Sequence, residues 1–143
     1  MTHAVIDDHL LRDFVAEDLS EQLNRVASEY ELATTNLYFV RLCKSVIRAR
    51  GGQLTGNWSP ERRRALGQRL LQLPDSILIV PMRLIGYRMA EVSGAHRVST
   101  LGAEAIAAAE HLGGPLCVWD GDDGAGIRSA AAASGIDYQT LSR

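Results

Sequence analysis

Carboxylates gather directly after two short apolar stretches of the sequence. They are Asp7 and Asp8 after positions 4–6, and Asp120, Asp122 and Asp123 after positions 116–119. In a parallel α/β sheet, the carboxyl ends of the strands surround the usual ligand site. Like charges brought within a few ångströms need a neutralising cation or a raised pKa. We therefore expect one acidic pocket, whose oxygen ligands suit Mg²⁺ or Mn²⁺. Such an ion could activate a water for the cleavage of a phosphodiester.

Simpler roles exist for some of these residues. Asp8 can cap the helix that follows it, and Asp122 or Asp123 can cap the helix expected after them. The two residues that directly follow an apolar stretch, Asp7 and Asp120, are harder to explain as helix caps. The sequence therefore favours a shared pocket built around Asp7 and Asp120.

The apolar pattern predicts the elements that position these acids. The expected strands are 4–6, 31–34, 76–80, 116–119 and 137–141, and the expected helices are 10–15, 17–29, 36–50, 60–73, 81–92, 100–112 and 125–134. The continuous apolar run 76–80 is expected to be a central strand covered on both faces, and Gly94 to break a helix. This alternation predicts a three-layer α/β/α sandwich with a short, mostly parallel central sheet, built from one domain over residues 1–143.

Composition and charge limit the classes of function. The chain is 46% hydrophobic and 22% charged, as expected of a globular protein. Its formal net charge of −2 gives no electrostatic footprint for non-specific nucleic-acid binding. The basic run 62–64 is expected to be a solvated helix face. His9 is expected to be a surface residue, although a histidine beside the aspartates could also bind a metal or carry a proton.

The cysteines and the amino end indicate the compartment. Cys43 and Cys117 lie in apolar runs, as buried thiols do in a reducing compartment. The first residues lack the basic and apolar regions of a signal peptide, and no apolar run approaches the ~20 residues that span a bilayer. We expect a cytoplasmic protein with no membrane partner.

Three stretches together carry a family resemblance. Positions 5–11 place an acid on Asp7, positions 32–36 precede a helix that contains Arg41, and positions 99–120 pair an alanine-rich helix with a strand that ends at Asp120. Over nearly the whole chain this pattern resembles the PIN (PilT N-terminus-like) domain family. Its members include the ribonuclease toxins of bacterial toxin–antitoxin pairs. The resemblance implies a PIN-like fold and a Mg²⁺- or Mn²⁺-dependent ribonuclease, with the ion held by three or four carboxylates.

The resemblance also assigns site residues and two departures. The metal ligands fall on Asp7, Asp120, Asp122, Asp123 and Glu104, and the catalytic residues on Asp7, Asp120 and Asp123. Arg41 stands where the family has a glutamate, and Gly102 where it has an aspartate. Glu104, two residues further on, replaces the missing acid only if the helix starts differently. A guanidinium near Asp7 would neutralise the pocket without a metal and lower the carboxylate pKa.

Two main functions and a third, weaker one follow. The first is a divalent-metal-dependent ribonuclease with a partly eroded acidic site, and the second is an inactive module that binds RNA or an antitoxin-like protein without metal. The third is a nucleotide-binding domain, suggested by the glycines of 121–126 but disfavoured by the lack of a lysine there. Leucine-rich faces on 17–29 and 60–73 predict a homodimer.

Overall fold

A single parallel sheet forms the middle of the molecule. The computed structural model describes residues 1–48 and 52–143. The strands are β1 (His3–Ile6), β2 (Glu31–Thr34), β3 (Leu78–Ile79), β4 (Leu116–Trp119) and β5 (Tyr138–Leu141). They lie in the order β3-β2-β1-β4-β5, and all four neighbouring pairs are parallel. The strand order therefore reverses at β1, between β2 and β4.

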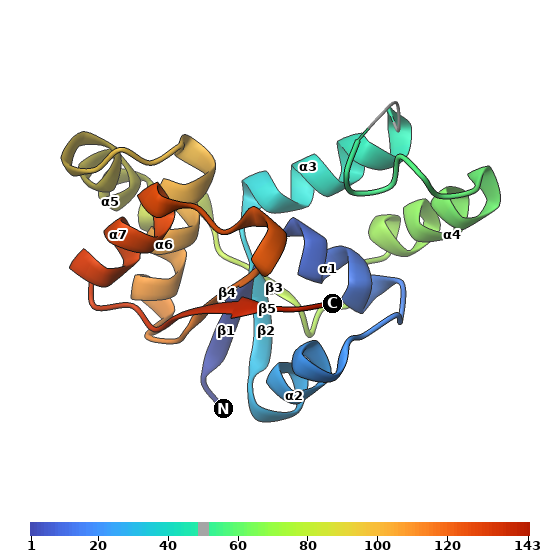
Figure 1. Ribbon diagram of the computed structural model, residues 1–143, viewed down its shortest axis with the longest axis horizontal. Coiled ribbons are helices and arrows are strands. Elements are labelled where there is room, and N and C mark those ends of the chain that lie inside the picture. The colour runs from blue at the N-terminus through green and yellow to red at the C-terminus, as the bar shows by residue number, and fades with distance from the viewer. Residues whose placement is uncertain (49–51) are drawn as a thin grey trace.

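Helices cover both faces of this sheet (Figure 1). In the described part of the chain they are α1 (Asp8–Val15), α2 (Glu21–Glu29), α3 (Asn36–Ile47), α4 (Pro60–Leu71), α5 (Met82–Ala95), α6 (Thr100–Leu112) and α7 (Ala125–Ala133). A 3-10 turn, η1 (Asp120–Asp122), follows β4. One apolar core joins the sheet to α5, α6 and α7, and a second joins it to α1, α2, α3 and α4. The predicted three-layer α/β/α sandwich is confirmed.

Alternation along β1 explains how one strand serves both cores. Val5 packs into the core under α6, whereas Ala4 and Ile6 pack into the core under α1. Each of these residues is completely buried. The small alanine side chains of α6 allow that helix to pack closely, so that residues 102–109 are buried without interruption. The centre of the sheet, including the carboxyl end of β1, is thereby fixed from both sides.

Polar side chains cap most of the helices in the described part of the chain. Ser20, Thr35, Ser59 and Ser99 each accept a hydrogen bond from the backbone N–H three residues ahead. The first helix differs, because Asp7 and not Asp8 is its cap. The prediction that Asp122 or Asp123 caps the last helix is also wrong, since α7 follows Gly124 with no side-chain cap. All three aspartates are therefore left for other contacts.

Three predicted elements differ in the structure. The apolar run 76–80 forms only the two-residue β3 at the edge of the sheet, so it is not the predicted central strand, although Ile77 and Val80 beside it are buried in the two cores. Gly94 lies inside α5, whose packing on α6 outweighs the roughly 1 kcal/mol that a helical glycine costs. The helix expected to reach position 50 ends at Ile47, and positions 49–51 lie outside the described residues.

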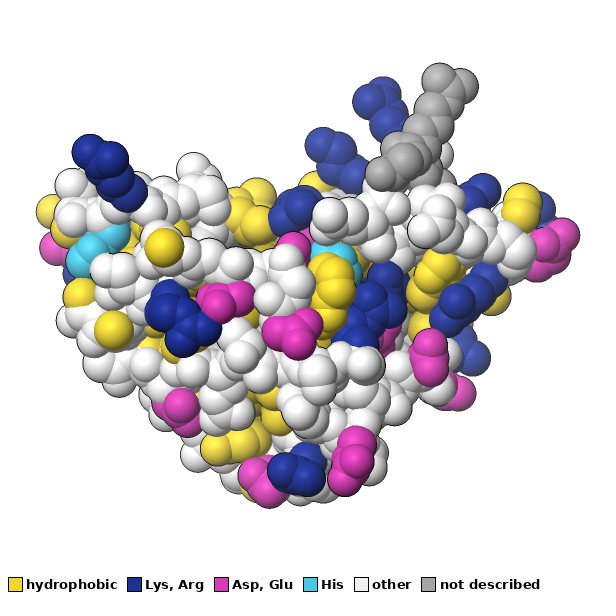
Figure 2. All heavy atoms as spheres, viewed as in Figure 1, with side chains coloured by type: hydrophobic (Ala, Val, Ile, Leu, Met, Phe, Trp, Pro, Cys, Tyr) yellow, Lys and Arg dark blue, Asp and Glu magenta, His cyan; other side chains and the backbone are white. Residues whose placement is uncertain are grey.

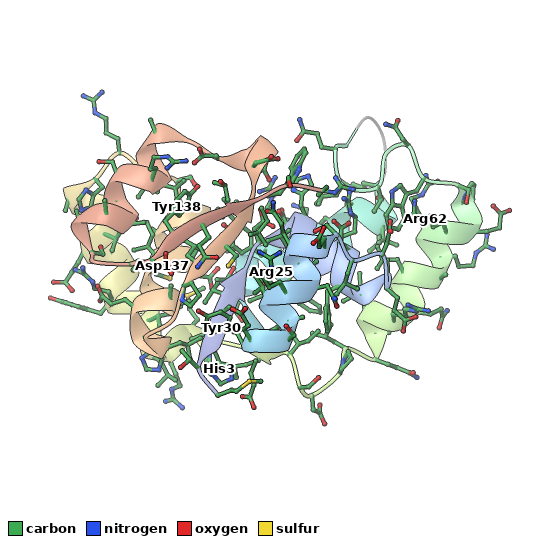
Figure 3. The ribbon with its side chains drawn as sticks, turned by 60° about the horizontal axis from the view of Figure 1, so that its bottom comes forward. His3, Arg25, Tyr30, Arg62, Asp137 and Tyr138 are labelled. Carbon is green, nitrogen blue, oxygen red and sulfur yellow. The ribbon has the colours of Figure 1, made fainter. Side chains whose placement is uncertain are left out.

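The remaining surface features concern partners. No helix in the described ranges combines the length and apolar character needed to cross a bilayer. The leucines expected to form a dimer face on α2 and α4, such as Leu23, Leu66 and Leu70, are buried in the chain's own core. Lys and Arg side chains gather instead over α3 and α4 (Figure 2). Arg62 projects from α4, far from Tyr138 on β5 (Figure 3), and pairs with Asp18.

Candidate functional site

Asp7 joins the two central strands at their carboxyl ends. One carboxylate oxygen accepts a hydrogen bond of 2.9 Å from the N–H of Leu10 in α1, and the other accepts one of 2.9 Å from the N–H of Trp119 in β4. The backbone N–H of Asp7 also donates to the carbonyl of Cys117, at 3.2 Å. Because β1 pairs with β4, the turn that follows β4 lies directly beside the first turn of α1. The two acidic strand ends therefore meet, although the expected pairing of Asp7 with Asp120 is not what brings them together.

Four side chains converge where these elements meet. They are Asp7, Asp8 and His9, all buried, and the more exposed Asp122 from η1. The Nδ1 atom of His9 lies 2.8 Å from Oδ2 of Asp122 and 3.3 Å from Oδ1 of Asp8. One ligand atom from each of the four residues can be chosen so that all lie within 4.8 Å of one another. This group, called the Asp/His cluster below, is the candidate site.

Arg41 supplies a cation to the same cluster. Its Nη1 atom lies 3.3 Å from Oδ2 of Asp8, and its side chain is about half exposed. The Oδ2 atom of Asp8 is itself buried and accepts no hydrogen bond from any described residue, and Nε2 of His9 is buried without a hydrogen-bond partner in the same sense. Buried polar atoms without hydrogen bonds are rare in folded proteins. Even with Arg41 nearby, Oδ2 of Asp8 and Nε2 of His9 therefore remain without a hydrogen-bond partner among the described residues and could contact a ligand.

Burial and hydrogen bonding shift the titration of the cluster. Burial, together with the charge of Asp8, raises the pKa of Asp7 to about 7. Burial lowers the pKa of His9, but hydrogen bonds to Asp122 and Asp8 outweigh it and raise the pKa to about 9. The hydrogen bond from His9 lowers the pKa of Asp122. Near pH 7 the histidine is thus protonated and balances part of the carboxylate charge.

A cavity opens next to the cluster between α3, α6 and α7. Its volume is about 300 Å³, and its wall includes Asp7, Asp122, Arg41, Arg97 and Gly102. Arg41 and Gly102 are the positions where the resemblance leads us to expect acids, and both line this cavity. A Cβ atom at Gly102 would come within 2.6 Å of Cγ2 of Val98. The backbone therefore leaves no room for a carboxylate at position 102 unless Val98 moves.

Of the predicted site residues, Asp120, Asp123 and Glu104 lie outside the Asp/His cluster. Asp120 is exposed at the start of η1, and the turn brings Asp122, two residues later, toward His9. Asp123 accepts a hydrogen bond of 2.8 Å from the hydroxyl of Tyr138 and pairs with Arg128, away from the cluster. The structure brings together Asp7 and Asp122 from the predicted set, and adds Asp8 and His9 to them.

Glu104 is buried and has a different environment. Its carboxylate accepts hydrogen bonds from the N–H of Leu37 at 2.9 Å, from the N–H of Asn36 at 3.2 Å and from Nδ2 of Asn36 at 2.9 Å. These donors belong to the first turn of α3, so Glu104 satisfies free N–H groups at a helix N-terminus. Its position links α6 to α3.

His9 is the site residue whose environment the sequence did not indicate. The prediction of a surface residue is wrong, because only 2% of its side chain is exposed. The ring of Trp119 covers it, with ring centroids 4.4 Å apart. The available signal was the unbroken run of Asp7, Asp8 and His9 directly after a buried strand, and all three side chains are buried.

The fold is similar to that of two solved structures. A chain described as "Toxin-antitoxin complex from Klebsiella pneumoniae" matches with a TM-score of 0.59 and 14% identity, over 87% of this chain and 92% of that one. The protein PAE2754 from Pyrobaculum aerophilum matches with a TM-score of 0.55 and 17% identity, over 96% of this chain and 83% of that one. No family model matches the sequence, and no curated protein matches it. At these identities the likeness describes the fold.

Proposed function

We propose that residues 1–143 form a single PIN-like domain that acts as a divalent-metal-dependent ribonuclease of the toxin type, with a partly eroded acidic site. The observation that carries the proposal is the meeting of Asp7 and Asp122 with Asp8 and His9 at the carboxyl ends of β1 and β4. The similarity in fold to a chain from a toxin–antitoxin complex supports it. The adjoining cavity is large enough to admit a phosphate group and part of a nucleotide.

The cluster fits a hard divalent ion. Carboxylate oxygens from three residues converge, and the buried Oδ2 of Asp8 lacks a hydrogen-bond donor among the described residues. Asp7, Asp8 and Asp122 would hold the ion, which when bound supplies an activated water and positive charge for phosphodiester cleavage. Arg41 and Arg97 line the cavity and can pair with phosphate oxygens of RNA, because a guanidinium matches them with two parallel donors. Nδ1 of His9 holds a proton against Asp122 while the site is metal-free.

The second candidate is a metal-free module that binds RNA or an antitoxin-like protein. It is favoured by the ion pair between Arg41 and Asp8 and by the contact between His9 and Asp122, which already compensate two carboxylates. Such a site would need no metal to remain folded.

A homodimer stays a prediction for both candidate functions. The apolar side chains that remain exposed for it on α3 and α4 include Ile47 and Leu71. Light scattering that returns a monomer would contradict it.

A thermal-shift titration with Mn²⁺ separates the two candidates. A native-state metal site raises the melting temperature as the metal concentration rises. We expect a rise for the wild type, and none for Asp7→Asn or Asp122→Asn relative to each variant's own metal-free value. Asp123→Asn is the matched control, because Asp123 lies in the same turn but outside the cluster. Its shift should equal that of the wild type.

RNA cleavage is then measured on the same proteins. We expect Mn²⁺-dependent cleavage of single-stranded RNA by the wild type and by Asp123→Asn, abolished by a chelator and by Asp7→Asn. A folded wild type that shows no thermal shift at millimolar Mn²⁺ and no cleavage would sink the ribonuclease proposal. RNA binding that persists under those conditions would support the metal-free module.

A further inference from the structure

An imidazole lies inside the carboxylate cluster. Nδ1 of His9 is 2.8 Å from Oδ2 of Asp122 and 3.3 Å from Oδ1 of Asp8. The ring cannot turn away easily, because its residue belongs to the first turn of α1 and its face lies against Trp119. The Nδ1 atom is therefore held close to the carboxylates of Asp122 and Asp8.

The spacing of these atoms matches that of neighbouring ligands on a small cation. Neighbouring ligands of an octahedral ion with bonds of about 2.1 Å lie roughly 3 Å apart. The two His9–carboxylate distances, 2.8 Å and 3.3 Å, bracket this value. The position between the Nδ1 atom and the carboxylates can thus hold an ion after only small side-chain movements.

A second observation points independently to a ligand. Asp8 is completely buried, yet its Oδ2 atom has no hydrogen-bond donor among the described residues. The contact with Arg41, at 3.3 Å, brings charge but no hydrogen bond of normal geometry. A buried carboxylate oxygen left in this way is costly unless another cationic partner completes its coordination. Asp8 belongs to the same cluster as His9, so one ion can contact both residues.

The choice of metal follows from the donor atoms. Mg²⁺ prefers oxygen ligands and keeps several waters, whereas imidazole nitrogen suits first-row transition metals. We propose that the Asp/His cluster takes a divalent first-row transition metal such as Mn²⁺ or Co²⁺ in preference to Mg²⁺, with Nδ1 of His9 as a ligand beside the carboxylates. For this, Nδ1 releases to solvent the proton that it holds against Asp122, so that metal binding and proton release occur together. This inference rests on the proposed metal-dependent function and names the ion and the nitrogen ligand that give the site its selectivity.

Metal affinities of wild type and His9→Gln test the selectivity. Calorimetry with Mn²⁺, Co²⁺ and Mg²⁺ should show that the wild type binds Mn²⁺ and Co²⁺ about tenfold or more tightly than Mg²⁺. Removing a ligand of this kind should cost at least the roughly 10–100-fold in affinity seen when supporting residues of metal sites are lost. We expect His9→Gln to lose most of this preference while its weak Mg²⁺ binding changes little. His111→Gln, at an exposed position of α6, is the matched control and should bind like the wild type.

A spectroscopic measurement on the wild type keeps the test independent of the variant's folding. Pulsed electron paramagnetic resonance of the Mn²⁺-loaded protein should show a nitrogen coupling from a directly bound histidine. A protein that binds Mn²⁺ and cleaves RNA, but shows no nitrogen coupling and an unchanged preference in folded His9→Gln, contradicts this inference and leaves the proposed function standing. A wild type that binds none of the three metals overturns both.

Discussion

Arg41 Nη1 lies 3.3 Å from Oδ2 of Asp8, so a guanidinium stands at the mouth of the cluster while its carboxylate partner is completely buried. An exposed ion pair of this length contributes little to stability, but here one partner is shielded from water, and its Oδ2 atom has no hydrogen-bond donor among the described residues. The cluster is therefore partly neutralised by the chain itself. An incoming cation must overcome the repulsion of Arg41 before it can bind.

Replacing Arg41 should strengthen metal binding. We expect Arg41→Gln to increase the rise in melting temperature that millimolar Mn²⁺ produces, and Arg41→Glu to increase it further, because the first change removes a repelling charge and the second adds an oxygen ligand. The measurement is a thermal-shift titration of each variant against its own metal-free baseline. Lys44→Gln is the control, since Lys44 is an exposed cation one turn further along α3. A smaller shift in both Arg41 variants would show that the arginine assists the site.

Stability without metal should fall as the pH rises from about 4 to 9. The pKa of Asp7 is raised from 3.8 to about 7, so the stability gained from its protonated form is complete below pH 3.8 and is lost as the pH rises through 7. The pKa of His9 is raised from 6.5 to about 9, so its contribution is complete below pH 6.5 and is lost as the pH rises through 9. The decrease in unfolding free energy, on the order of 4 kcal/mol for Asp7 and 3 kcal/mol for His9, is measured by urea unfolding in the presence of a chelator.

Two variants divide this pH dependence. Asp7→Asn cannot titrate and should lose the part of the decrease between pH 4 and 7, whereas His9→Gln should lose the part between pH 6.5 and 9. Asp137→Asn, an exposed aspartate at the start of the last strand, provides a comparison with the wild-type profile. If Asp7→Asn and the wild type gave parallel profiles below pH 7, the raised pKa of Asp7 would be refuted.

Glu104 should matter for folding and not for metal. In Glu104→Gln one carboxylate oxygen becomes an NH₂ group, which faces the N–H donors of Leu37 or Asn36 and leaves one of them unsatisfied. We expect a loss of about 1–3 kcal/mol in unfolding free energy with an unchanged Mn²⁺ shift. The control is Glu110→Gln, at an exposed position of α6, the helix that also carries Glu104. It weakens the ion pair of Glu110 with Arg88 of α5 and should cost less than about 0.5 kcal/mol. A lost Mn²⁺ shift in folded Glu104→Gln would instead assign the residue to the metal site.

An acid can return to position 102 only with a second change. Gly102→Asp should lower the melting temperature, because its Cβ would lie 2.6 Å from Cγ2 of Val98. Val98→Ala removes that methyl group, so the double variant should recover most of the loss relative to Val98→Ala alone. Thermal unfolding of the three variants and the wild type measures this coupling. A single Gly102→Asp variant as stable as the wild type would show that the backbone adjusts at no cost.

Much of the fold could be predicted because local and tertiary signals agree. The apolar stretches placed most helices and strands within a few residues, and their alternation along the chain predicted the parallel sheet between two helical layers. The edge position of β3 could not be predicted from its apolar run, because Ile77 and Val80 are buried by packing outside the ladder. Periodicity reports burial, and burial does not by itself fix the pairing of a strand.

The site was harder to predict than the fold. The sequence indicated that acids at the ends of β1 and β4 would meet, and Asp7 with Asp122 does so. The prediction that Asp120 would share the pocket with Asp7 is wrong, because the 3-10 turn leaves Asp120 exposed and turns Asp122 inward. The burial of His9 depends on Trp119, which is remote in sequence. Glu104 was placed in the metal set as a possible replacement for the acid missing at position 102. Only the position of α3 relative to α6 shows that its carboxylate instead accepts three hydrogen bonds from Asn36 and Leu37.

The two hydrogen bonds of Asp7 have a consequence for what an aspartate at this position can reveal. Its carboxylate holds the N–H groups of Leu10 and Trp119, so replacing it with an apolar residue would leave two buried donors unsatisfied at the centre of the sheet. Selection for folding alone is therefore enough to keep this aspartate, whether or not the cluster binds a metal. An aspartate at position 7 is thus no evidence by itself of catalysis, and the proposed function has to be tested through the metal-dependent measurements described above.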